Sequence, residues 1–122
     1  MMYCKAVLFH DMEIAEKILI STNPRDQKAL GRKVHHYDEK IWALFREGIV
    51  YTGNYAKFIQ NPELKQLLLA TRGTTLVEAS PYDRIWGIGL GEDDVRAKNR
   101  QTWKGLNLLG EILTRVREAL AE

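Results

Sequence analysis

Apolar residues recur at helical spacing over most of the chain, which predicts a mainly helical protein. A first helix is predicted from about Met2 to Ile20, with a shared apolar face of Leu8, Met12, Ala15 and Leu19. Asn23-Pro24 is typical of a helix start, with the asparagine as cap and the proline at the first helical position. This second helix is predicted to end at Gly31.

The middle of the chain repeats this pattern. His35 to Tyr37 are predicted to form a connector, and Asp38 can cap the next helix. The apolar side of that helix is predicted to hold Ile41, Trp42, Phe45 and Ile49. Gly48 and Gly53 weaken this helix without ending it, and Asn61-Pro62 forms a second cap-and-start pair. A helix is therefore expected from Pro62 to about Thr71.

The C-terminal third adds a β component to the prediction. Thr74 to Glu78 has strand composition, and Ile85 to Leu90 can form another short strand. The segment 91–101 is polar and predicted to be a loop. The last helix is expected from about Lys104 to Leu120, with a buried face of Leu106, Leu109, Leu113, Val116 and Leu120. The predicted fold class is α+β, mainly α: one domain over residues 1–122 with a small β-sheet.

Composition narrows the functional classes. The 122 residues have a net charge of only +2, so the strong basic footprint of a nucleic-acid-binding protein is absent. Cys4 is the single cysteine, which excludes an intramolecular disulfide and fits a reducing cytoplasmic setting. No apolar run approaches the length needed to cross a bilayer, and no secretion signal is recognisable, so no membrane association is expected.

Three familiar site patterns are weak here. His35-His36 lacks a cysteine or carboxylate at ligand spacing, so no metal site is expected. Cys4 and His10 are six residues apart and do not share a helical face, which argues against a catalytic pair. The glycines of residues 87–91 have the wrong spacing for a dinucleotide fingerprint, and a charged loop follows them instead of a helix.

Two tryptophan-glycine segments are better candidates for a ligand site. The first is Trp86-Gly87-Ile88-Gly89, in which an indole lies beside backbone with few side chains. The second opens the predicted last helix and contains Trp103, Lys104, Gly105 and Asn107. Flat rings and free N–H groups at a helix start suit a base-plus-phosphate ligand. The alternative is that both tryptophans fill a core and the glycines make turns.

Lys5 and Asp83 are the candidate reactive groups. Lys5 lies at the margin of the apolar face of the first predicted helix, where its ammonium can either extend to solvent or point into a cleft. Asp83 precedes Trp86 by three residues. A carboxylate beside a flat ring suits cleavage of a sugar–base bond, because it stabilises an oxocarbenium-like transition state. The alternative for Asp83 is a turn residue after Pro81.

These residues carry a family resemblance. The C-terminal motifs are Asp83-Arg84-Ile85-Trp86-Gly87-Ile88-Gly89, Asn99-Arg100-x-x-Trp103-x-Gly105-x-Asn107-x-Leu109-Gly110 and Arg117. The earlier motifs are Met1-x-x-x-Lys5-Ala6, Gly31-Arg32, Phe58-x-Gln60-Asn61, Leu64-x-x-x-Leu68 and Leu76-Val77-Glu78. Over essentially its whole length the chain resembles the NADAR family of YbiA-like proteins. The resemblance implies an N-glycosidase that cleaves a ribose C1′–N bond, with no metal and no cofactor.

The resemblance also implies roles for individual residues. Lys5 would contact the reacting sugar or its phosphate, and Asp83 would orient water or the ribose. Trp86, beside Gly87, would stack on the base. The segment containing Trp103, Lys104, Gly105 and Asn107 would bind phosphate.

Three functions are compatible with this resemblance. The first is hydrolysis of phosphorylated ribosylamines such as early riboflavin-pathway intermediates. The second is removal of ADP-ribose from guanine, with ADP-ribosylated guanine in nucleic acid as a partner. The third is a non-catalytic nucleotide- or ADP-ribose-binding module.

One departure from the family pattern generates a further expectation. The family has an upstream Thr-x-Glu motif whose glutamate is thought to be catalytic, and this chain begins immediately after that position. We therefore expect a domain that lacks the family's N-terminal segment and hydrolyses substrate more slowly than a version extended to include it. Apolar positions near Met1, Lys5 and Leu8 are expected to be exposed or covered by a second copy in a homodimer.

Overall fold

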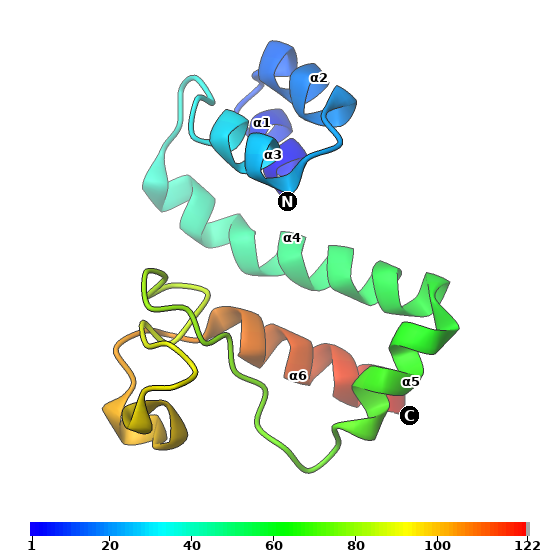
Figure 1. The fold of residues 1–122 in the computed structure, drawn as a ribbon. Helices are drawn as coiled ribbons and strands as arrows, with labels where there is room; N and C mark the ends of the chain where they lie inside the picture. Colours follow the sequence, from blue (N-terminus) through cyan, green and yellow to red (C-terminus); the bar gives the residue numbers. More distant parts are fainter. Residues whose placement is uncertain (122) are drawn as a thin grey trace. The chain divides into compact units, whose positions relative to one another are not determined.

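The computed structural model describes residues 1–121 and is built from helices joined by loops. Its elements are α1 (Met2–Leu8), α2 (Met12–Ile20), α3 (Pro24–Gly31), α4 (Glu39–Gln60), α5 (Pro62–Ala70), two short 3₁₀ helices (Val95–Lys98 and Arg100–Thr102) and α6 (Leu108–Ala121). Figure 1 shows their order along the chain. The chain divides into two compact units, Met1–Ile49 and Val50–Glu122.

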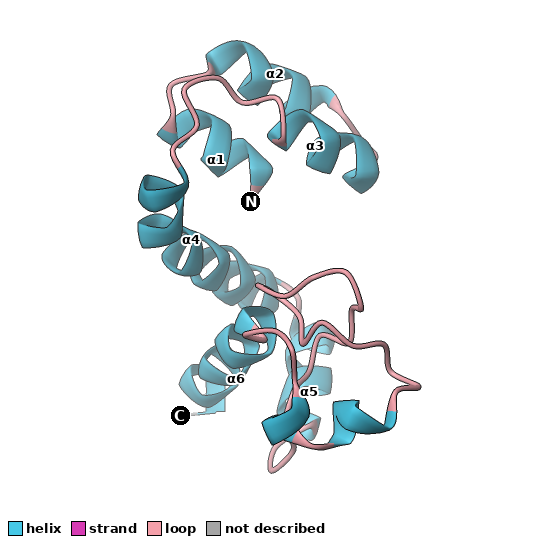
Figure 2. Ribbon diagram, turned by 90° about the vertical axis from the view of Figure 1, so that its left-hand side faces the viewer, coloured by secondary structure: helices cyan, strands magenta, loops and turns pink. Residues whose placement is uncertain are grey.

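The first unit contains a small three-helix arrangement. Helices α1, α2 and α3 all contact one another (Figure 2). Their apolar faces meet the first part of α4 in one cluster of buried residues, Ala6, Phe9, Ile14, Ala15, Ile18, Val34 and Trp42. Gly31 allows close packing against α1, because a Cβ at this position would lie 2.1 Å from the sulfur of Met2. The predicted helix start at Asn23-Pro24 and end at Gly31 are confirmed.

The prediction of one helix from Met2 to Ile20 is wrong. The helix breaks at residues 9–11, where His10 adopts a left-handed φ of 58°. Asp11 then caps α2, accepting the backbone N–H of Ile14 at 3.1 Å. The break rotates the second helix, so Met12 and Leu19 are 57% and 69% exposed instead of buried. Asp11 was readable as an N-cap from its type and position, but the apolar spacing across the break concealed it.

Around α4 and α5 the predicted boundaries are confirmed. Asp38 accepts the backbone N–H groups of Lys40 and Ile41, and the helix continues through both glycines to Gln60. Trp42 is buried, whereas Ile41 and Phe45 are 41% and 50% exposed. Helix α5 starts at Pro62 as expected, although the Asn61 amide donates back to Lys57 instead of capping α5.

The second unit has its own apolar cluster. Its buried members are Val50, Leu68, Ile112, Val116 and Leu120. Helices α5 and α6 contact each other in this unit (Figure 1). Arg117 of α6 is buried and donates to the carbonyl oxygens of Thr71 and Thr74 at 2.8 and 2.9 Å. This arginine therefore fixes the turn that follows α5.

The predicted small β-sheet is wrong, because residues 1–121 contain no strand. Segment 74–78 has no regular secondary structure, and side chains bond its backbone where a strand partner would. Asn107 donates to the Leu76 carbonyl and accepts the Glu78 N–H, each at 3.0 Å. Carbonyl oxygens of residues 84–88 accept N–H groups from residues 104–109 without the regular pairing of a ladder. The fold class is therefore mainly α.

The predicted start of the last helix at Lys104 is also wrong. Helix α6 begins at Leu108, after Asn107, which has a left-handed φ of 53° and is fully buried. Leu106 is consequently 62% exposed and outside the helix, whereas Val116 and Leu120 are buried as expected. The polar segment 91–101 contains the first short 3₁₀ helix and the start of the second, which ends at Thr102.

None of the helices described between residues 1 and 121 combines the length and apolar character that a membrane span requires.

Candidate functional site

Lys5 has a specific environment in the first unit. It is half-buried on α1, and its Nζ lies 4.5 Å from the centroid of the Tyr37 ring and 5.7 Å from that of Trp42. Burial lowers the pKa of Lys5 from its usual range; the negative charge of Glu39 opposes this shift and the positive charge of Arg32 adds to it. The sequence left open whether this ammonium extends to solvent or points into a cleft; in the structure it is half-buried and lies over two aromatic faces.

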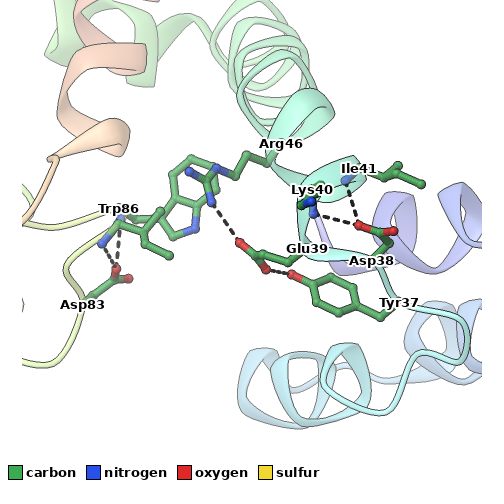
Figure 3. A network of polar contacts seen from close by, with 9 residues as sticks. Tyr37, Asp38, Glu39, Lys40, Ile41, Arg46, Asp83 and Trp86 are labelled. Atoms are coloured by element: carbon green, nitrogen blue, oxygen red, sulfur yellow. Dashed lines mark hydrogen bonds and ion pairs between the residues drawn. The ribbon is translucent and has the colours of Figure 1, made fainter.

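A polar chain extends from the Tyr37 ring. The Tyr37 hydroxyl donates a hydrogen bond to Glu39 Oε2, and Arg46 Nη1 lies 3.6 Å from Glu39 Oε1 (Figure 3). Burial and the hydrogen bond to Glu39 raise the pKa of Tyr37 to about 12. Tyr37 is therefore a neutral donor at physiological pH, with one ring face turned to a cation.

Sequence reasoning missed Tyr37, Glu39 and Arg46 as companions of Lys5. The sequence places Tyr37 in a predicted connector, and Glu39 and Arg46 belong to none of the motifs singled out above. The only available signal was the seven-residue spacing of Glu39 and Arg46, which places them on one side of a helix two turns apart. Their relation to Lys5 depends on the packing of α1 against α4, which no local pattern reveals.

Asp83 and Trp86 lie together in the second unit. The Asp83 carboxylate accepts the backbone N–H groups of Ile85 and Trp86 at 3.0 and 2.8 Å through the same oxygen, Oδ1 (Figure 3). This is the turn arrangement considered for Asp83, and it leaves Oδ2 without a contact to those two N–H groups. Trp86 is half-buried and packs against the second unit's apolar cluster.

The glycines of the two tryptophan segments pack closely together. A Cβ at Gly105 would lie 2.3 Å from the carbonyl oxygen of Gly87. A Cβ at Gly87 would lie 2.8 Å from the Glu78 oxygen and 2.9 Å from the Asp83 oxygen. Both positions therefore need glycine to let backbone approach backbone. The structure thus brings the two motifs together through their backbones.

The segment 103–107 was expected to offer free backbone N–H groups to a phosphate, but several of these groups are already hydrogen-bonded within the protein. The N–H groups of Lys104, Leu106 and Asn107 donate to the carbonyls of Ile88, Arg84 and Gly87, respectively, at 2.8–3.0 Å. These donors are therefore already satisfied. The Asn107 side chain is likewise engaged with segment 76–78. The side chain of Lys104 is exposed.

Trp103 stabilises the loop that precedes it. Its Nε1 donates to the Ala97 carbonyl at 2.8 Å, and the Arg100 guanidinium lies 5.2 Å from its ring centroid. The indole thus links the two 3₁₀ helices to the start of the Lys104 segment.

No group of three or more metal-ligating side chains occurs in the part of the chain that the structure describes. His35 instead contacts Asp11, which accepts its backbone N–H at 2.8 Å and lies 2.7 Å from its ring Nδ1. Near the N-terminus, Met1, Met2 and Tyr3 line a groove of about 310 Å³ with residues of α2 and α3. Met1 is 46% exposed there, whereas Leu8 packs against the first unit's core.

Comparison with known proteins assigns the family. The NADAR domain model matches residues 1–121. The chain belongs to the NADAR family. The resemblance drawn from the tryptophan-glycine motifs is confirmed by this match.

Several relatives have names that state an activity. The chain is 44% identical over 118 residues to "N-glycosidase R617" of Acanthamoeba polyphaga mimivirus, covering 97% of this chain and 69% of that protein. It is 34% identical over 119 residues to "N-glycosidase YbiA" of Shigella flexneri, covering 98% of this chain and 68% of that protein. The predicted enzyme class, a hydrolase of N-glycosyl bonds, is the class that the names of these two relatives state.

A third relative, protein irg-1 of Caenorhabditis elegans, is 47% identical over 121 residues. The match covers 98% of this chain and 57% of irg-1, so the chain spans little more than half of that protein. The riboflavin biosynthesis protein PYRR of Arabidopsis thaliana is 32% identical over 109 residues, which is 16% of its length.

Proposed function

We propose that this protein is an N-glycosidase that hydrolyses the C1′–N bond of phosphorylated ribosylamines. The observation that carries the proposal is the NADAR match over residues 1–121, together with relatives named N-glycosidases. The riboflavin name of PYRR supports early riboflavin-pathway intermediates as the substrate class. In the reaction, water adds to C1′, the C1′–N bond breaks, and the nitrogen leaves with a proton. The products are ribose 5-phosphate and the free amine.

Lys5 is the proposed cationic group. Its half-buried ammonium lies against two aromatic rings, where charge is screened less than in bulk water. An ammonium in such a place attracts a phosphate or an oxygen of the reacting sugar more strongly than one on a flexible surface side chain. When substrate binds, the Lys5 ammonium would leave these aromatic faces and contact the anionic group of the substrate instead.

Asp83 and Trp86 are the proposed groups of the second unit. One Asp83 oxygen fixes the turn, and we propose that the other orients water or a ribose hydroxyl. Trp86, adjacent to Gly87, is proposed to stack on the base, and the exposed Lys104 between Trp103 and Gly105 to contact phosphate. Asn107 contributes by holding the backbone around these groups. A cytoplasmic location is proposed as well, consistent with the free thiol of Cys4.

A substrate panel tests this proposal. The protein from its complete gene is incubated separately with a pyrimidine ribosylamine 5′-phosphate and with ADP-ribosylated guanosine, and the released sugar is measured by mass spectrometry. Release of ribose 5-phosphate from the first compound supports the proposal. Release of ADP-ribose alone assigns the guanine-directed activity instead, and binding of both without release assigns a non-catalytic module.

A further inference from the structure

We propose that Glu39 is a positioning residue for Lys5 and acts through Tyr37. The contacts form one chain within the first unit: Arg46 lies against Glu39, Glu39 accepts the Tyr37 hydroxyl, and the Tyr37 ring lies over the Lys5 ammonium. The catalytic importance of Lys5 rests on the proposed function, whereas the effect of Glu39 on Lys5 does not.

The geometry of Tyr37 makes it the link between the two charges. Its hydroxyl end is fixed by Glu39, and its ring packs against Phe9 in a T-shaped arrangement, with the two centroids 5.3 Å apart and an interplanar angle of 64°. The ring is thus held at two points, while one face remains for the ammonium at 4.5 Å. A ring held in this way limits the positions that a long, flexible lysine can occupy.

Glu39 is itself anchored by its own helix. Arg46 follows it by two helical turns, and its Nη1 lies 3.6 Å from Glu39 Oε1. The other carboxylate oxygen is therefore directed to the tyrosine hydroxyl, as Figure 3 shows. Without this anchor an exposed glutamate would sample many rotamers, and Tyr37 would lose its fixed acceptor.

The charges around Lys5 and Tyr37 agree with this role. Glu39 favours the charged form of Lys5, Arg32 disfavours it, and burial disfavours it most. For Tyr37, Glu39 and Asp38 favour the neutral hydroxyl and Arg46 opposes them. Glu39 is thus a carboxylate that acts on both side chains.

The test measures how readily Lys5 is acetylated as a function of pH. Only the neutral amine reacts, so the rate at Lys5, followed by peptide mass spectrometry, reports its protonation and its position. Removing the Glu39 charge with Glu39→Gln should lower the Lys5 midpoint by about half a pH unit, which makes acetylation roughly threefold faster at pH 8.5. Glu13→Gln is the matched control, because Glu13 pairs with the exposed Lys17 at 3.5 Å and should leave Lys5 unchanged.

Tyr37→Phe separates action through the tyrosine from direct charge action. This variant keeps the ring and the Glu39 charge but removes the hydroxyl that joins them. We expect it to shift the Lys5 profile, and we expect the double variant with Glu39→Gln to shift it no further than the larger single effect. An unchanged profile in Tyr37→Phe, or additive shifts in the double variant, would overturn the route through Tyr37.

The acetylation assay does not depend on substrate turnover. An unchanged Lys5 profile in Glu39→Gln would refute the positioning role even if the protein proves to be an N-glycosidase. Conversely, a shifted profile with no glycosidase activity would refute the proposed function alone. Circular dichroism of each variant verifies that the helices are intact; should Glu39→Gln fail to fold, Glu39→Asp keeps the charge, shortens the side chain and should still disturb the Lys5 profile.

Discussion

The side-chain amide of Asn107 hydrogen-bonds the backbone next to and at Glu78, as a neighbouring β-strand would. Its oxygen accepts the Glu78 N–H at 3.0 Å while its nitrogen donates to the Leu76 carbonyl at 3.0 Å. The side chain is fully buried, so water cannot replace either bond. This one residue therefore joins the segment after α5 to the start of α6.

Replacing Asn107 should destabilise the second unit strongly. In Asn107→Ala the Glu78 N–H and the Leu76 carbonyl lose their partners, which is expected to lower the free energy of unfolding by about 2–4 kcal/mol. Asn54→Ala is the control, because the Asn54 amide only bonds the Val50 carbonyl of its own helix. Urea denaturation of both variants measures the difference. Equal, small effects would show that the Asn107 bonds contribute little.

Alanine substitution is expected to change the stability of the protein in opposite directions at Gly105 and Gly53. Gly105→Ala should cost about 1–3 kcal/mol, because its Cβ would approach the Gly87 carbonyl oxygen to 2.3 Å. Gly53→Ala lies within α4 with nothing within 4 Å of its Cβ, and should stabilise by up to about 1 kcal/mol. Thermal melts of the two variants should move in opposite directions; a tolerated Gly105→Ala would contradict the close backbone approach.

The Asp11 carboxylate should make the stability of the fold depend on pH in the acid range. The N–H of His35 is the main cause that holds the pKa of Asp11 below its ordinary value of 3.8. A depressed folded-state pKa means that the ionised carboxylate stabilises the fold fully above about pH 4, and that this contribution disappears as the pH falls through the depressed value. The stability difference between the native protein and Asp11→Asn, followed by denaturation at several pH values, should therefore shrink below pH 4. A difference that stays constant down to pH 2 would exclude this role.

The sequence predicts those parts of the fold that depend on neighbouring residues and misses those that depend on residues far apart along the chain. Local cap-and-start pairs at Asn23-Pro24 and Asn61-Pro62 correctly located two helix starts, because the signal lies within a few residues. The strands were wrong because Asn107 and Arg117 reach segment 71–78 from about 30 to 46 positions away. Such side-chain substitutes for a strand leave no periodic trace in the segment they bind.

In the candidate site, too, local features were predicted from the sequence and distant contacts were not. Trp86 and Asp83 were identified from a local motif, and their proximity is a property of one turn. Lys5 was identified from its marginal position on a helical face. Its partners Tyr37 and Glu39 are more than thirty residues away in sequence and were missed, since only the packing of the first unit brings them to it.

Trp86 should contribute to ligand affinity if it stacks on the base. Trp86→Ala is expected to weaken binding of a stable ribonucleoside 5′-monophosphate by roughly ten- to a hundredfold, because base–aromatic stacking contributes about 1–3 kcal/mol. Trp86→Phe should retain much of the affinity, and Tyr82→Ala, at a side chain 97% exposed, should retain all of it. Calorimetric titration provides the measurement. Unfolding of Trp86→Ala, or unchanged affinity, would assign this ring to the core.

The most direct measurement of the central claim is the release of ribose 5-phosphate from a pyrimidine ribosylamine 5′-phosphate, compared between the protein from its complete gene and its Lys5→Met variant. The account predicts release above the uncatalysed background and a loss of about 10²-fold or more in the variant. Lys17→Met, at an exposed lysine of the same unit, should leave the rate unchanged. Equal rates with and without Lys5, or no release above background in the unaltered protein, would contradict the account.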